Sequence, residues 1–306
     1  MTSQRIIRRR ECDIKMDSMN KQLTIALFGA GGKMGCRIID HLNESNGYCV
    51  LCVETGEQGL VRLKDRGLAP VSRDAALAEA NIVILALPDR KLGPFAREIV
   101  PQLKPGTMVF TLDPAAAYAG EFPARADISY FISHPCHPSV FDHFQTEAEI
   151  NDFFGGIHAR QAIVCALMQG PEEDYARGEQ LARAIYAPVT RAHRVTVEQM
   201  AILEPAMAET VAIGLVMTLR EALEEAVRKG VPREAAEDFM FGHIKVELGI
   251  AFGRVNFPFS DGAKLIANYG REHILKPDWR KLFEPASVRQ QVQAIVSGEV
   301  PVAKPN

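Results

Sequence analysis

A run of glycines lies between an apolar segment and a helical one near the start of the chain. The apolar segment Leu23–Phe28 leads into Gly29-Ala30-Gly31-Gly32-Lys33-Met34-Gly35, and the pattern from Cys36 to Leu42 is helical. Glycines in such a turn let a dinucleotide pyrophosphate approach the N–H groups at a helix N-terminus, where a Cβ would hold it away. The sequence therefore predicts a Rossmann-type cofactor site at Gly29, Gly31, Gly32, Lys33, Met34 and Gly35.

An acidic residue lies at the distance that such a turn requires. Glu54 ends the second apolar segment, 25 residues after Gly29. A carboxylate at this place accepts hydrogen bonds from both ribose hydroxyls and repels a 2′-phosphate, so it favours NAD over NADP. The alternative is a solvated loop glutamate. Leu87 and Pro88 follow another apolar segment and are expected to contact the nicotinamide side of the cofactor, unless they form an ordinary strand-end turn.

Alternating apolar and helical segments fill the first half of the chain, which is typical of a parallel sheet with crossover helices. After about Thr196 helical stripes dominate, and Gly230-Val231-Pro232 marks a helix stop and restart. We predict an α/β fold, a Rossmann-type doubly wound parallel sheet followed by an all-helical second domain. The predicted parts are a flexible extension at 1–20, the dinucleotide-binding domain at 21–195 and a helical substrate and dimerisation domain at 196–306. Strands are expected at 23–28, 48–53, 82–86, 107–111, 130–133, 161–168 and 188–195.

Composition narrows the class of protein. A formal net charge of −3 gives no reason to expect nucleic acid as a partner. The apolar runs are broken by charges or proline and fall short of the ~20 residues that span a bilayer. The six cysteines show no paired C-x-x-C sets, and Cys49 and Cys52 point to opposite faces of a predicted strand, which indicates reduced thiols. We therefore expect a soluble cytoplasmic protein without nucleic-acid or membrane partners, whose long apolar helices predict a homodimer.

The candidate chemistry lies in Ser133-His134-Pro135-Cys136-His137-Pro138, at the end of a predicted strand. An imidazole titrates near neutral pH, so His134 can act as general base on a substrate hydroxyl. It can also bind a metal, and His137 is three residues away, a usable but unspecific ligand spacing. Ser133 and His137 are candidates for substrate contact. The alternative is a turn with incidental histidines.

A second candidate group lies in the helical half. On a single helix over 200–227, the apolar residues Met200, Met207, Val211 and Leu215 form a stripe with Glu204 in its middle. A carboxylate on a core face is costly without a cation or donor, so Glu204 is predicted as a site residue or a structural ion pair. Pro205 directly after it disfavours helical geometry at Glu204.

These segments resemble the superfamily of 6-phosphogluconate and β-hydroxyacid dehydrogenases. Ser133-His134-Pro135 resembles the Ser-His-Pro loop of prephenate dehydrogenases, whose histidine handles the substrate hydroxyl. β-Hydroxyacid dehydrogenases carry a catalytic lysine, with an asparagine four residues on, in the helix that opens their second domain. The stretch 198–210 of this chain contains neither, which argues against simple β-hydroxyacid dehydrogenase chemistry.

Through 133–138, 202–210 and Gly242-His243-Ile244-Lys245, the chain is similar to D-apionate oxidoisomerases over nearly its whole length. That resemblance implies oxidation of the 2-hydroxyl of a branched sugar acid by NAD, followed by an α-ketol shift to a 3-oxo acid. A divalent metal would stabilise charge on two neighbouring oxygens during the shift. His134, His137 and Glu204 are the available ligands, with His134 as either ligand or base.

Two other functions remain open from the sequence. The first is a simple NAD(P)-dependent hydroxy-acid dehydrogenase that oxidises without rearrangement. The second is a non-catalytic dinucleotide-sensing protein, which would have no need of a histidine-rich loop beside the cofactor.

Overall fold

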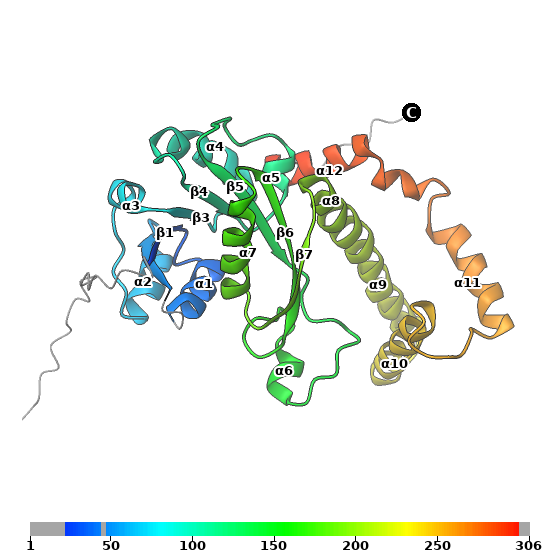
Figure 1. Ribbon diagram of the computed structural model, residues 1–306. Helices are drawn as coiled ribbons and strands as arrows, with labels where there is room; N and C mark the ends of the chain where they lie inside the picture. Colours follow the sequence, from blue (N-terminus) through cyan, green and yellow to red (C-terminus); the bar gives the residue numbers. More distant parts are fainter. Residues whose placement is uncertain (1–21, 44–46, 300–306) are drawn as a thin grey trace, which may run out of the picture. The chain divides into compact units, whose positions relative to one another are not determined.

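The computed structural model describes residues 22–43 and 47–299 (Figure 1). The predicted extension at 1–20 lies outside these residues. The described chain forms two compact units, one running up to Ala201 and including the residues from Val292, the other spanning Ile202–Gln291. The sequence predicts a boundary at 195/196 and does not indicate that the last part of α12, from Val292, belongs to the first unit.

Seven strands form the sheet of the first unit, in the order β2-β1-β3-β4-β5-β6-β7. Strands β1 to β5 are mutually parallel, as predicted, whereas β6 runs antiparallel to β5 and β7 is parallel to β6. A parallel neighbour needs a crossover connection. The chain instead returns from β5 through a loop with the short helix α6, which permits the antiparallel pairing. The strands are β1 Leu23–Phe28, β2 Tyr48–Val53, β3 Ile82–Leu85, β4 Met108–Thr111, β5 Ser129–Pro135, β6 Gln161–Gln169 and β7 Val189–Arg194.

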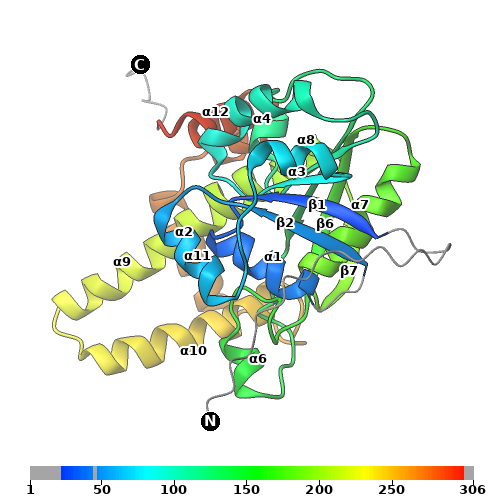
Figure 2. The same cartoon turned by 90° about the vertical axis from the view of Figure 1, so that its left-hand side faces the viewer.

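Helices cover both faces of this sheet. Helices α1 and α7 pack against each other on one face, and Figure 2 shows α3 and α4 on the opposite side from α1. The central strands β3 and β4 are buried on both faces, which explains their continuous apolar sequence. The helices of this unit are α1 Lys33–Asn43, α2 Glu57–Asp65, α3 Arg73–Glu79, α4 Asp89–Ile99, the 3-10 helix η1 Val100–Gln102, α5 Ala115–Tyr118, α6 Glu147–Asn151, α7 Glu173–Ile185 and α8 Val197–Ala201.

The strand order brings the predicted site segments to one edge. Strand β1 has β2 on one side and β3 on the other, so the chain changes direction across the sheet at β1. In open α/β sheets, ligands bind outside the carboxyl ends of the strands at such a switch point. The glycine-rich turn follows β1, Glu54 follows β2, and Leu87 comes shortly after β3. All therefore lie at the same edge.

The second unit is all helical, as predicted. Gly230 has a left-handed φ of 98° between α9 and α10, where the sequence predicts a helix stop. The elements are the π-helix η2 Ile202–Ile213, α9 Gly214–Arg228, α10 Arg233–Ala251, α11 Asp261–Ile274, the 3-10 helix η3 Trp279–Phe283 and α12 Pro285–Ser297, whose last part belongs to the first unit.

One helical run is long and apolar enough, by length and composition, to cross a membrane. Residues Val197–Arg228 contain an 18-residue window of mean hydropathy 1.6, of which 22% is buried. The prediction that no segment reaches this length was wrong, because the helix continues through Pro205 instead of stopping there. A run that is this apolar and this exposed needs either a lipid or a protein surface to cover it.

Candidate functional site

The glycine-rich turn is built by close backbone approach. Gly29 has a left-handed φ of 75°, and a Cβ on it would collide with the carbonyl oxygen of Ala86 at the end of the β3 segment. A Cβ on Gly35 would collide with the carbonyl oxygen of Gly29, and one on Gly31 with the backbone of Gly59. These three positions therefore require glycine for the turn itself, before any cofactor is considered.

Helix α1 begins at Lys33, so its first N–H groups open toward the turn without intrahelical acceptors. The N–H of Gly32 donates to the carbonyl of Gly29 (2.9 Å) and closes the turn. The Met34 side chain packs against the core, which leaves its backbone as the part available to a pyrophosphate. The Leu87 side chain lies against Gly29, at the place where the sequence predicts cofactor contact.

Glu54 is held against this turn by three backbone donors. Its Oε2 accepts from the N–H of Gly31 (2.9 Å), and its Oε1 accepts from those of Thr55 and Gly56 (2.8 Å each). An ionised carboxylate offers about four acceptor positions. One therefore remains for a ribose hydroxyl, and the carboxylate is already oriented.

Arg62 is a cation at this turn that the sequence analysis did not select. Its Nε donates to the carbonyl of Gly31 (2.6 Å), while Glu54 accepts from the N–H of the same residue. The return of α2 alongside the turn, which spacing does not reveal, brings it there.

We expect Glu54→Gln to narrow the preference for NAD over NADP by roughly 5- to 150-fold, the equivalent of about 1–3 kcal/mol for a lost charge-assisted interaction. The variant removes the charge that repels a 2′-phosphate and leaves the guanidinium of Arg62 nearby. The measurement is kcat/KM with each cofactor. Glu57→Gln is the control, because Glu57 is an exposed acidic residue at the start of α2. It should change kcat/KM with neither cofactor. A wild-type protein that turns over NADP faster than NAD would contradict the prediction.

His134 lies near the carboxyl end of β5, two residues beyond Ile132, the last residue of that strand that pairs with β4. Its Nδ1 is 2.8 Å from the carbonyl oxygen of Leu112. A carbonyl only accepts, so Nδ1 carries the proton and Nε2 carries the lone pair. Burial lowers the pKa of His134 below its ordinary value, against the opposing effects of that hydrogen bond and of Asp113. At neutral pH His134 therefore offers one basic nitrogen.

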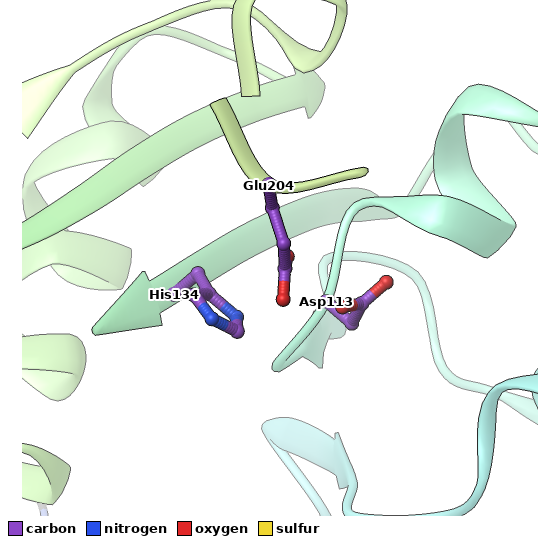
Figure 3. Close-up of side chains that lie close together, drawn as sticks. All are labelled: Asp113, His134 and Glu204. Atoms are coloured by element: carbon purple, nitrogen blue, oxygen red, sulfur yellow. The ribbon is translucent and has the colours of Figure 1, made fainter. Parts of the chain in front are cut away.

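Ligand atoms of Asp113, His134 and Glu204 lie within 4.8 Å of one another (Figure 3). All three side chains are partly buried. Asp113 follows β4, and its Oδ1 accepts from the N–H of Ala115 (2.7 Å), which fixes the carboxylate at the start of α5. Asp113 is not among the residues predicted from the sequence. The sequence feature that could have identified it is an acidic residue directly after a buried parallel strand, at the edge where such sheets bind ligands.

Two predicted site residues lie outside the group of Asp113, His134 and Glu204. Ser133 is fully buried and donates its hydroxyl to the carbonyl of Val164 (2.9 Å), because β5 continues beyond it to Pro135. It therefore faces the core and not a substrate. His137 is exposed and has a left-handed φ of 60°; its Nδ1 donates to the carbonyl of Phe154 (2.9 Å). The predicted ligand set was His134, His137 and Glu204. Among the described residues, the structure groups Asp113 with His134 and Glu204 instead of His137.

Glu204 reaches the group for a different reason than predicted. The predicted stripe assumed 100° per residue, but Ile202–Ile213 is a π-helix with wider turns, and it contains Pro205. Met200 is buried, whereas Met207 and Leu215 are 47% and 42% exposed, so the stripe is not a buried face. A proline lacks the N–H for a helical bond, and a π-turn accommodates that loss.

Comparisons with known proteins agree with these features. Residues 142–296 match the family described as phosphogluconate dehydrogenase (decarboxylating), C-terminal. The chain is similar to a D-apionate oxidoisomerase of Cupriavidus necator, at 47% identity over 272 residues, 89% of this chain and 98% of the relative. A D-apionate oxidoisomerase of Rhizobium rhizogenes gives the same identity and coverage. A crystal structure of a semialdehyde dehydrogenase NAD-binding protein from Cupriavidus necator, in complex with calcium and NAD, has a TM-score of 0.88 and 46% identity and covers 90% of this chain and 100% of that one.

Proposed function

The chain belongs to the D-apionate oxidoisomerase family, and from that membership we propose that it converts D-apionate to 3-oxo-isoapionate with NAD as oxidant. The observation that carries the proposal is the group Asp113, His134 and Glu204, which meets at the edge of the sheet that also carries the glycine-rich turn. A dinucleotide sensor has no use for such a group.

The reaction has an oxidation and a rearrangement. In the oxidation, the C2 hydroxyl loses its proton and the C2 hydrogen leaves with its electron pair to the nicotinamide, which gives a 2-ketone and NADH. In the α-ketol shift, the C3 hydroxyl loses its proton and becomes a ketone, while a carbon substituent migrates from C3 to C2 and the C2 oxygen is protonated. Both steps need a proton acceptor and negative charge stabilised on adjacent oxygens.

The cofactor is NAD. The turn from Gly29 to Gly35 and the first N–H groups of α1 would hold its pyrophosphate, and Glu54 its adenosine ribose. Leu87 and Pro88 would lie on the nicotinamide side. The fit rests on the turn's close backbone approach and on the oriented carboxylate of Glu54.

We propose that Asp113, His134 and Glu204 hold a divalent cation. The donor set fits, because two carboxylates and one neutral imidazole are ligand types that divalent metals accept. The hydrogen bond to Leu112 fixes the ring so that Nε2 is the ligand atom, a common arrangement for metal-bound histidine. When bound, the cation supplies Lewis-acid polarisation of two neighbouring substrate oxygens.

His134 and Glu204 remain the residues that we propose for the chemistry, now with Asp113. Because a neutral imidazole has one lone pair, His134 serves as ligand or as general base, but not as both at once. His137 stays a candidate for substrate contact. Its Nδ1 donates to the carbonyl of Phe154, so its Nε2 is the nitrogen that would accept a hydrogen bond from a substrate. Ser133 is withdrawn because its hydroxyl is buried.

The direct test is turnover of D-apionate with NAD, followed by NADH absorbance, with the carbon skeleton of the product determined by NMR. A linear sugar acid is the control and should turn over poorly. A rearranged skeleton supports the proposal. An oxidised but unrearranged product would instead identify a simple hydroxy-acid dehydrogenase. NAD binding without turnover of any sugar acid would identify a sensor.

We also propose that the protein is a soluble, cytoplasmic homodimer. Many large apolar side chains of the second unit are exposed, well beyond what a monomer usually shows. A second copy of the chain would cover them, as obligate homodimer interfaces are large and apolar. They include Leu215, Val216, Met217, Phe239, Phe241, Val246, Leu265, Ile266 and Tyr269.

Light scattering on the purified protein is expected to give twice the chain mass of 33.7 kDa, without detergent. Val216→Glu would place a charge on an exposed apolar position of α9, 63% exposed in the chain, and should shift the mass toward the monomer. Val61→Glu is the control, because Val61 is similarly exposed on α2 of the first unit. A monomeric wild type, or a chain that stays in solution only with detergent, would contradict the homodimer.

A further inference from the structure

Phe154 lies beside the start of helix α1, although 55% of its surface is exposed. The Nζ atom of Lys33 is 4.1 Å from the centre of the Phe154 ring. Lys33 is the first residue of α1, at the helix end where a dinucleotide pyrophosphate binds. A cation over an aromatic face is attracted by the ring's quadrupole, so Phe154 restricts where this ammonium can be.

The segment that carries Phe154 is tied into a closed turn. The Oδ2 atom of Asp152 accepts from the N–H groups of Ile157 (2.9 Å), His158 (2.8 Å) and Ala159 (3.1 Å). One carboxylate thus joins both ends of the turn. Phe154 is therefore presented by an ordered segment and not by a free loop.

The same segment is attached along one face of α1. Arg37 donates to the carbonyl of Gly155, and the ring of His41 is hydrogen-bonded to the carbonyl of Gly156. Lys33, Arg37 and His41 are spaced by four residues and share a face of the helix. The turn therefore follows the dinucleotide-binding helix from its first residue onward.

On its other side, Phe154 contacts the histidine loop. Its carbonyl accepts from Nδ1 of His137 (2.9 Å), and the two rings lie 6.0 Å apart. One residue thus touches both the helix that starts the cofactor site and a candidate substrate residue. The same ring meets the ammonium of Lys33.

We propose that Phe154 is a positioning residue for the cofactor, which holds the ammonium of Lys33 where it meets the pyrophosphate of NAD. This inference rests on the proposed use of NAD. A lysine has a flexible stem and loses conformational freedom when it binds a phosphate. Restricting that stem beforehand lowers the cost of binding, so the ring contributes to affinity without touching the cofactor.

The test compares Phe154→Leu, which removes the ring, with Phe154→Tyr, which keeps it. NADH binding is measured by fluorescence titration, together with KM for NAD, KM for the sugar acid and kcat. The leucine variant should bind NADH ~3- to 10-fold more weakly, with a matching rise in KM for NAD only. The tyrosine variant should stay within about twofold of wild type.

A double-mutant cycle with Lys33→Met separates positioning from loop folding. If Phe154 acts through Lys33, Phe154→Leu should have little further effect on NADH binding once the ammonium is gone. Equal weakening in both backgrounds would show a structural role and overturn the inference. Unchanged or tighter binding in Phe154→Leu alone would overturn it as well. A wild-type protein that binds no NADH would overturn both this inference and the proposed use of NAD, whereas the other outcomes leave that use intact.

Discussion

His134→Asn is expected to lower kcat by about 10²-fold or more and to leave NADH affinity nearly unchanged. The partly buried imidazole places its basic nitrogen in the group with Asp113 and Glu204. Asparagine keeps a similar size but supplies no base and a poorer metal ligand. The measurements are kcat with D-apionate and the dissociation constant of NADH.

The control for this substitution is His143→Asn, because His143 is an exposed histidine in the connection between β5 and β6. It should behave as wild type. Near-full turnover of His134→Asn would remove His134 from the mechanism. A large loss of NADH affinity would instead place the residue in the cofactor site.

Chelation is expected to abolish turnover, and an added divalent cation to restore it. The substitution Glu204→Gln should lower turnover at least ~10-fold relative to the wild type, since changes to metal ligands and their neighbours commonly have effects of this size. The melting temperature should change little, because the amide keeps the shape of the carboxylate. The measurements are turnover and melting temperature, each with and without chelator.

Glu209→Gln on the same π-helix is the matched control, because Glu209 is exposed and outside the Asp113, His134 and Glu204 group. It should keep activity and chelator sensitivity. If Glu204→Gln melts early while the wild type ignores the chelator, Glu204 is a structural residue. That result would exclude the proposed metal site and leave the proposed dehydrogenase chemistry intact.

The parallel part of the fold could be predicted because its signals are local. Strands β1 and β2 have the predicted bounds, since continuous apolar runs between turn residues define them without tertiary context. The antiparallel β6 has equally apolar residues. Its direction depends on the connection from β5, and the strand sequence contains no information on direction.

The candidate site was predicted only where one segment supplies the whole signal. The glycine-rich turn is such a segment. Asp113 and Arg62 approach their partners through the packing of separate elements, so spacing along the chain did not reveal them. Ser133 was predicted as a site residue because it is next to His134 in the sequence. Side chains alternate along a strand, so Ser133 points into the core.

The return of the last part of α12 to the first unit affects how this protein can be made and cut. Val292 on α12 is 1% exposed and belongs to the unit that otherwise ends at Ala201. The helical unit is therefore an insertion in a discontinuous domain. On the ribosome, the dinucleotide-binding domain gains this buried part of α12 only after the helical unit has been synthesised. A fragment that stops at Ala201 leaves that part of its core uncovered, so the two units are not separable by a single cleavage.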